Sequence, residues 1–392
     1  MEATYVPTAP PYAKSKRLDS LDSIRGLAAL AVLLGHTVGA FSWPADWTRL
    51  PILNILFDGR SAVTMFFVLS GFVLSRPYLG SSTAGQPPRQ LCLRTFYLRR
   101  LTRIYLPWLF VFALSALAQI YVPRTDATVP STSAWLQGFW HFHLSAANAL
   151  RQCAFLQHDH SQLLIPQDWS LGVELKGSAL IPLFLFLMRK HVFLLLGVGL
   201  LLLFCVPTGH YYVSFIFGVM AARYYGTLEA RLASFTTRAK LGTLCVGLLL
   251  YQVRLPASSF GPISNGIEKV VWCIAGLGCV LILITSLGSN RIERALSHGI
   301  FVGLGRISYS VYLLQFLILL CVLPPLIRAL NAIGINQIPV LLPTTVCASL
   351  LSTIALALLT YRLIEVPSIA LGRILTTRIQ KHRRLAAYPS ES

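Results

Sequence analysis

Two ionisable side chains, Arg25 and His36, lie eleven residues apart in the hydrophobic stretch LDSIRGLAALAVLLGHTVGAF. Ionisable groups within a membrane span are costly and mark functional sites by default. At about 100° per residue, eleven helical steps make three turns plus about 20°, so both side chains share one helix face, roughly 16 Å apart. Asp22 falls on the same stripe. Because neutral imidazole accepts a proton near pH 7, we expect His36 to act as a general base or nucleophile.

A carboxylate and a hydroxyl form a second candidate group in the segment WSLGVELKGS. Glu174 lies about five residues inside the expected extracytoplasmic surface, and Ser178 follows one helical turn deeper on the same face. Glu174 and His36 approach a similar depth from opposite sides. We therefore expect Glu174 to orient His36 or to bind an acceptor hydroxyl.

Basic residues cluster in the segment FYLRRLTRIYLPW, at the expected cytoplasmic surface. Arg100 and Arg103 are one helical turn apart, so both guanidinium groups can grip one phosphorylated ligand. Positive-inside anchoring, which needs no ligand, is the alternative explanation of these arginines.

A further polar segment, GLGRISYSVYLLQ, interrupts an otherwise apolar stretch. Its Arg306, Ser308 and Tyr309 are expected to line the same cavity as Asp22 and Ser178. The pair His158 and His160 is a weak metal signal, so no metal site is predicted.

The elements that carry these residues are predicted from composition. The 392 residues are 55% hydrophobic and only 12% charged, with mean hydropathy +0.65, which indicates an all-α, polytopic membrane helix bundle. About ten transmembrane spans are predicted, at roughly 22–42, 59–79, 102–121, 169–188, 191–207, 210–224, 238–253, 267–287, 299–322 and 340–362. A cleavable signal peptide ending near residues 38–40 is the alternative for the first span. The long preceding region with Asp19 and Asp22 argues against it.

The formal net charge of +19 is explained by where the basic residues stand. If the N-terminus is cytoplasmic, 25 of the 33 Lys and Arg residues fall in inside segments, seven fall outside and Lys176 lies within a span. This bias predicts two cytoplasmic termini and argues against a nucleic-acid partner. We divide the chain into a flexible cytoplasmic tail (1–17), a transmembrane domain (18–370) and a basic cytoplasmic C-terminal tail (371–392).

Six ordered motifs resemble one known family. LDSIRGLAALAVLLGH, MFFVLSGFVLS, FYLRRLTRIYLP, WSLGVEL, GRISYSVYLL and YRLIEVP closely resemble the membrane acyltransferase 3 family of O-acyltransferases over roughly 18–370. The resemblance implies a ten-helix bundle that moves an acyl group, most often acetyl, from cytoplasmic acyl-CoA to a hydroxyl of an extracytoplasmic glycan.

The resemblance also implies roles for individual residues. The family's arginine and histidine pair falls on Arg25 and His36, and its paired-arginine motif falls on Arg100 and Arg103, which would bind the donor or assist catalysis. Its WSLxVE signature includes Glu174. Trp169 and Ser170 belong to the same signature, and we expect them to line the cavity.

Two positions depart from the family pattern. Many members carry an acidic residue where this chain has Thr64, and many carry a histidine where it has Gln315, so neither position is assigned proton chemistry. We expect no C-terminal hydrolase-like domain of the kind that some relatives carry. Transfer would then be completed within the bundle or by a separate glycan-assembly partner.

The sequence therefore predicts a multi-pass O-acyltransferase of the cell (inner or cytoplasmic) membrane. Its substrates would be acyl-CoA, as donor rather than bound cofactor, and a glycan or lipid-linked saccharide such as exopolysaccharide or lipopolysaccharide O-antigen. A transporter or flippase, whose polar stripe conducts protons or a lipid-linked sugar without forming a bond, is the rival from another class. An inactive relative acting as a scaffold is a third possibility.

Overall fold

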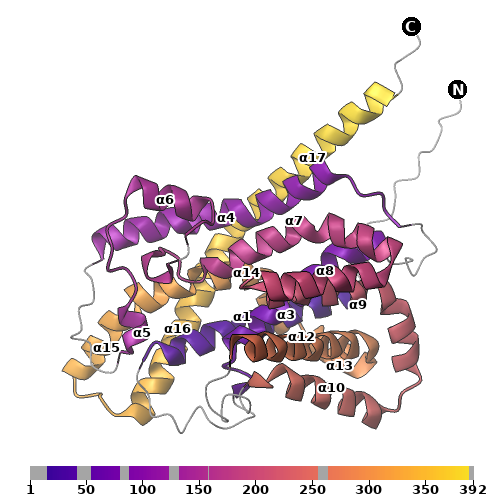
Figure 1. The fold of residues 1–392 in the computed structure, drawn as a ribbon. Helices are drawn as coiled ribbons and strands as arrows, with labels where there is room; N and C mark the ends of the chain where they lie inside the picture. The colour runs from indigo at the N-terminus through magenta and orange to yellow at the C-terminus, as the bar shows by residue number, and fades with distance from the viewer. Residues whose placement is uncertain are drawn as a thin grey trace, which may run out of the picture.

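The protein is a bundle of helices that run mostly side by side (Figure 1). The computed structural model describes residues 16–41, 54–79, 88–122, 132–157, 159–254 and 264–387. Within these ranges β-structure is limited to an isolated bridge between Phe41 and Thr132. The prediction of an all-helical protein is confirmed for this part of the chain.

Each predicted span coincides with a helix. The helices are α1 (Lys16–Gly39), α3 (Gly59–Leu79), α4 (Leu93–Tyr121), α7 (Asp168–Lys190), α8 (Val192–Cys205), α9 (Gly209–Ala233), α10 (Thr237–Tyr251), α12 (Asn265–Gly288), α14 (Gly299–Cys321) and α16 (Ile338–Thr360).

Seven stretches of the described chain are long and apolar enough to cross a membrane, which makes this a multi-pass membrane protein. They lie at 19–39, 59–79, 93–121, 168–190, 265–288, 299–332 and 338–380. Helices α8 and α10, with 14 and 15 residues, are shorter than the roughly 20 that a span requires. Helix α9 is long enough but carries Arg223, Glu229 and Arg231. The prediction of ten spans is therefore supported at seven positions.

Short helices fill the connections. On the predicted outer side lie α5 (Ala134–Gln137), α6 (Ala146–Cys153), the 3-10 turn η2 (His160–Gln162) and α15 (Leu323–Ala332). Helix α13 (Asn290–Leu296) joins α12 to α14 at the other end.

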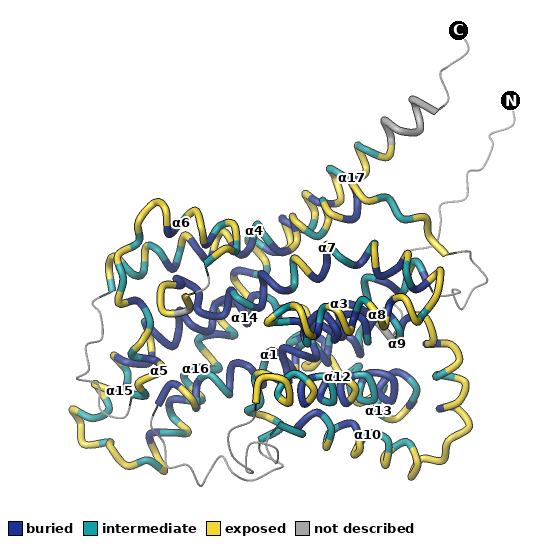
Figure 2. The backbone as a smooth tube through the Cα atoms, in the orientation of Figure 1, coloured by how far each residue is buried: buried dark blue, intermediate teal, exposed yellow. Residues whose placement is uncertain are grey.

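Glycines allow the central helices to pack at very short range. Gly305 of α14 lies so close to α1 that a Cβ there would collide with the backbone carbonyl of Asp22. Helices α3 and α9 meet in the same way, through Gly71 and Gly218. The burial pattern agrees, since α1, α3 and α14 are largely dark blue in Figure 2 while α10 and α17 are exposed along much of their length. Helices α1, α3 and α14 are thus firmly enclosed, whereas α4, which carries Arg100 and Arg103, is less so.

Both predicted domain boundaries fall inside helices. The boundary at 17 lies within α1, and the boundary at 370 lies within α17 (Val366–Ala387), which follows α16 directly through the π-turn η3 (Tyr361–Glu365). Helix α17 packs against α4, where Arg99 Nε donates to Thr376 Oγ1 at 3.1 Å, and its far end projects from the bundle (Figure 1). The predicted C-terminal tail therefore begins as helix, because its sequence is rich in good helix formers.

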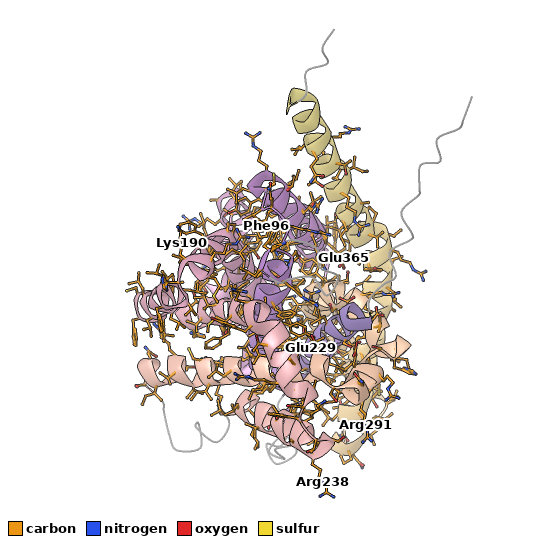
Figure 3. The ribbon with its side chains drawn as sticks, turned by 90° about the vertical axis from the view of Figure 1, so that its right-hand side faces the viewer. Phe96, Lys190, Glu229, Arg238, Arg291 and Glu365 are labelled. Atoms are coloured by element: carbon orange, nitrogen blue, oxygen red, sulfur yellow. The ribbon has the colours of Figure 1, made fainter. Side chains whose placement is uncertain are left out.

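One end of the bundle gathers the basic residues of the predicted inside segments. In Figure 3, which views this end, Lys190, Arg238 and Arg291 lie around the rim. Lys190 is the last residue of α7, Arg238 lies in the first turn of α10, and Arg291 belongs to α13. Their common placement agrees with the charge count, while the cytoplasmic identity of this end remains a prediction.

Candidate active site

A polar pocket lies inside the bundle, between helices α1, α3, α4, α7 and α14. It holds about 670 Å³ of empty space, its open mouth included. Its charged side chains are three arginines, Arg25, Arg100 and Arg103, and one carboxylate, Glu174, so their formal charges sum to +2. A pocket with this charge suits an anionic ligand.

Glu174 is held by Arg100. Arg100 Nη2 forms an ion pair with Glu174 Oε1, and Arg100 Nε donates to Ser178 Oγ at 2.9 Å. Ser70 Oγ donates to the same carboxylate oxygen at 3.2 Å. The structure does not bring Glu174 to His36, because the carboxylate pairs with a cation that reaches it from α4, and an orienting role toward His36 stays a prediction.

This pairing also corrects the predicted depth of the arginines. Arg100 is seven residues from the start of α4, about 10 Å along the axis, and its long side chain extends further inward to Ser178. Arg25 likewise lies nine residues from the start of α1, roughly 14 Å in. Both guanidinium groups are inside the bundle and not at its surface.

Arg25 and Arg103 complete the basic wall. Arg25 Nη1 lies 3.5 Å from Asp22 Oδ1, one turn back on α1, so Asp22 acts on the pocket through Arg25 and does not line it. Within the described part of the chain, Arg103 forms no hydrogen bond or ion pair. Its donors are therefore the ones most available to a ligand.

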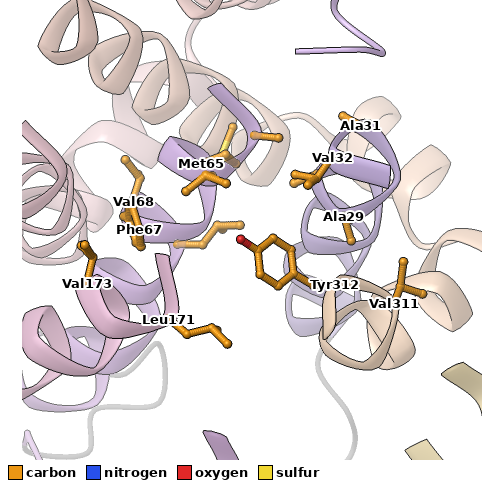
Figure 4. Close-up of a cluster of buried hydrophobic side chains, with 14 of the residues drawn as sticks. Ala29, Ala31, Val32, Met65, Phe67, Val68, Leu171, Val173, Val311 and Tyr312 are labelled. Atoms are coloured by element: carbon orange, nitrogen blue, oxygen red, sulfur yellow. The ribbon is translucent and has the colours of Figure 1, made fainter. Parts of the chain in front are cut away.

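Hydroxyl groups from α7 and α14 form the opposite wall. Ser170 Oγ and Tyr312 Oη are 2.5 Å apart, and Tyr309 Oη donates to the carbonyl oxygen of Ile104 at 2.7 Å. Ser308 also lines the pocket and donates to the carbonyl of Gly305 at 2.7 Å. In Figure 4, Tyr312 extends from α14 toward α3 and α7. These contacts fix the tyrosines that border the basic groups.

His36 lies beyond this pocket, three residues from the C-terminal end of α1. Its Nδ1 is 3.0 Å from Oε1 of the fully buried Gln315, and Gln315 Nε2 donates to the carbonyl oxygen of Tyr312 at 3.0 Å. A carbonyl only accepts, so the amide nitrogen must face Tyr312 and the amide oxygen must face the imidazole. Nδ1 therefore carries the proton, and the lone pair of His36 is on Nε2.

The two sites are linked along parallel helices. Helices α1 and α14 run in the same direction, with Asp22 beside Gly305 near one end and His36 beside Gln315 near the other. Tyr312 borders the pocket, and its carbonyl receives the Gln315 amide one turn further on. The basic pocket and the imidazole thus occupy successive positions along one helix pair.

The remaining predicted wall residues lie elsewhere. Ser178 is buried beneath Arg100 instead of facing the pocket, and Arg306 is exposed because it lies on the outer face of α14. Trp169 packs against Tyr211 with ring centroids 5.3 Å apart and lines a second pocket on the other face of α7. Trp169 and Ser170 are neighbours in the signature, but they face different pockets because successive helix positions differ by a rotation of about 100°.

Helical spacing could have identified the polar face of α14 in advance. Gly305, Ser308, Tyr309, Tyr312 and Gln315 follow one another at intervals of three, one, three and three residues. Tyr312 and Gln315 belong to the polar segment that the sequence predicts to line the cavity, and the period that groups the first three residues includes them.

No group of three or more metal-binding side chains occurs in the described residues. His158, part of the weak metal signal, lies outside them.

A bundle with several membrane-spanning helices and an internal basic pocket defines a multi-pass membrane protein able to hold an anionic substrate. The model of the family described as "Acyltransferase domain" matches residues 18–362, and the chain belongs to this family. It is also similar to the acyltransferase MdmB of Streptomyces mycarofaciens, with 25% identity over 328 residues, which cover 77% of this chain and 79% of that protein. No solved structure matches the chain. The protein is thus a membrane acyltransferase.

Proposed function

We propose that the protein transfers an acetyl group from acetyl-CoA, supplied from the cytoplasm, to a hydroxyl of an extracytoplasmic carbohydrate such as exopolysaccharide or O-antigen. The observation that carries this proposal is the position of His36. Gln315 holds the proton on its Nδ1, which leaves the lone pair on Nε2, and Gln315 lies one helical turn beyond Tyr312, a wall residue of the pocket of formal charge +2. The first feature suits proton removal from an alcohol, and the second suits a phosphorylated donor.

The basic wall would hold the negatively charged parts of the donor. Arg100 is paired with Glu174, and Arg25 is paired with Asp22, so Arg103 supplies the uncompensated charge for phosphate groups. Glu174 then has a positioning role, since it fixes the Arg100 side chain against Ser178. A planar guanidinium binds phosphate oxygens through paired hydrogen bonds, which favours arginine over lysine at such a site.

The imidazole would perform the chemistry. In the direct route, Nε2 takes the proton of the acceptor hydroxyl while its oxygen attacks the thioester carbonyl; the carbon–sulfur bond then breaks and the CoA thiolate leaves with a proton. In the two-step route, Nε2 attacks the thioester carbonyl, the carbon–sulfur bond breaks and the CoA thiolate leaves. The acceptor hydroxyl then attacks the acetyl group, the carbon–nitrogen bond breaks, and the hydroxyl proton passes to the thiolate or to solvent, which restores the neutral imidazole. Both routes require the tautomer that Gln315 selects.

Labelled acetyl-CoA tests the proposal. Membranes containing the wild-type protein should move label from acetyl-CoA into surface polysaccharide as a base-labile ester. The His36→Ala variant should show no transfer while remaining folded in the membrane. His191→Ala, at the exposed α7–α8 turn, is the matched control and should retain full activity. Transfer by His36→Ala would refute the assignment, and label that never leaves acetyl-CoA would favour a transporter.

A further inference from the structure

An aromatic cluster surrounds the imidazole on the side away from the basic pocket. The ring centroid of His36 is 4.9 Å from that of Phe316 and 5.6 Å from that of Trp135. Trp135 and Phe316 are 5.5 Å apart, and Phe139 contacts both of them edge to face, at 5.3 and 5.4 Å. The candidate base is therefore a member of a four-ring cluster.

Trp135 differs from the other rings by its exposure. Its residue is 41% exposed, whereas Phe316, which contacts both Trp135 and His36, is 3% exposed. Phe316 thus packs the core of the bundle, while Trp135 presents indole surface next to a reactive group. Such a surface is common at a membrane interface, where tryptophan anchors a protein, and it is also a usual surface for binding a ring-shaped ligand.

The backbone ties Trp135 to the helix that carries His36. Ser133 Oγ donates to the carbonyl of Gly39 at 2.8 Å, and Ser133 N donates to the carbonyl of Ala40 at 3.0 Å. Ser133 also caps the four-residue helix α5, where its Oγ accepts from Leu136 N at 3.3 Å. These bonds fix the position of α5 relative to the end of α1. A tryptophan that served only as a lipid anchor would not need this attachment to the helix of the candidate base.

We infer that Trp135 is the binding platform for the acceptor, and that the acceptor is a pyranose sugar packed by its ring against the indole with one hydroxyl directed at His36. This inference rests on the proposed function and adds an acceptor site, which the proposed function does not specify. The C–H groups on a pyranose face carry partial positive charge and pack well on the electron-rich face of an aromatic ring. Because the two ring centroids are only 5.6 Å apart, a sugar in contact with Trp135 also borders the imidazole.

A comparison of KM and kcat tests the inference. The assay uses labelled acetyl-CoA and the surface polysaccharide of the expressing cells. Trp135→Ala should raise KM for the polysaccharide about ten-fold, while KM for acetyl-CoA stays unchanged. Trp135→Phe, which keeps a ring, should raise it less and also guards against a folding defect in the alanine variant. Tyr121→Ala is the matched control, since Tyr121 is 79% exposed at the end of α4, and it should change neither constant.

The outcomes separate this inference from the proposed function. If the wild-type protein transfers no label, the proposed function fails and the acceptor platform fails with it. If the wild type transfers label but Trp135→Ala keeps its KM for polysaccharide, the platform alone is overturned. A fall in kcat with unchanged KM would also overturn it, because that result indicates a tryptophan that only supports His36.

Discussion

Replacement of Gln315 by leucine should slow acyl transfer without weakening donor binding. Gln315 Oε1 is the acceptor that holds the proton on Nδ1 of His36, and its removal leaves that N–H without a partner in the bundle interior. Leucine has nearly the same volume, so the packing of α14 against α1 should survive. The imidazole can then regain a hydrogen bond only by moving its proton to Nε2, which blocks the reactive lone pair.

The size of the effect follows from this hydrogen bond. An unsatisfied buried donor costs about 1–3 kcal/mol, and each 1.36 kcal/mol changes a rate by about ten-fold. We therefore expect kcat to fall between about five-fold and about 150-fold. KM for acetyl-CoA should stay the same, because Gln315 bonds to His36 and Tyr312 and not to the arginines of the pocket.

Steady-state transfer of labelled acetyl, normalised to folded protein in the membrane, measures both constants. Gln119→Leu is the matched control, since that amide donates to the carbonyl of Phe142 in the α5–α6 connection, at 2.9 Å. It should keep kcat within about two-fold, a change of about 0.4 kcal/mol. If Gln315→Leu retained the wild-type kcat, the tautomer argument would be refuted, whatever the role of His36.

Two further predictions concern the basic pocket and the helix contact. Arg103→Ala should raise KM for acetyl-CoA about ten-fold or more, because a charge-assisted hydrogen bond contributes about 1.5–3 kcal/mol. Arg99→Ala, which removes an arginine bound to α17, should not change KM for acetyl-CoA. If both variants changed this KM equally, the arginines of α4 would serve only to orient the protein in the membrane. Gly305→Leu should lower the thermal unfolding temperature and the activity, since its side chain would collide with the backbone at Asp22. Gly303→Leu on the same helix has nothing within 4 Å, and an equal loss there would exclude the helix contact as the cause.

The sequence predicted the positions of the helices well, but it predicted poorly which side chains of different helices contact one another. Long apolar runs define α3 and α14 within a few residues, because hydropathy depends only on local composition. The spacing of Arg25 and His36 was also readable, since one helix period determines it. The pairing of Glu174 with Arg100 was not readable from the sequence, because depths estimated from positions along the helices ignored the length of the arginine side chain.

Trp135 and Gln315 show a second reason why contacts in the site could not be predicted from the sequence. Trp135 lies in a connection whose place beside His36 depends on the bonds that Ser133 makes to the end of α1. Gln315 differs from the residue usual in the family, so the family pattern gave it no role. The role of each residue depends on its contact with His36, in a segment far away along the chain. A single sequence does not specify such contacts.

The hydrogen bond between His36 and Gln315 also bears on how the protein is made. The two residues are 279 positions apart, so at about 5–20 residues per second the ribosome needs roughly 14–56 s to reach the second after the first. During that interval α1, with Arg25 and His36, waits in the insertion machinery or in lipid without its final neighbour α14. A nascent chain released before α14 would therefore be inserted but chemically inert. A gene divided after α12 should regain activity only when both fragments are produced in the same membrane.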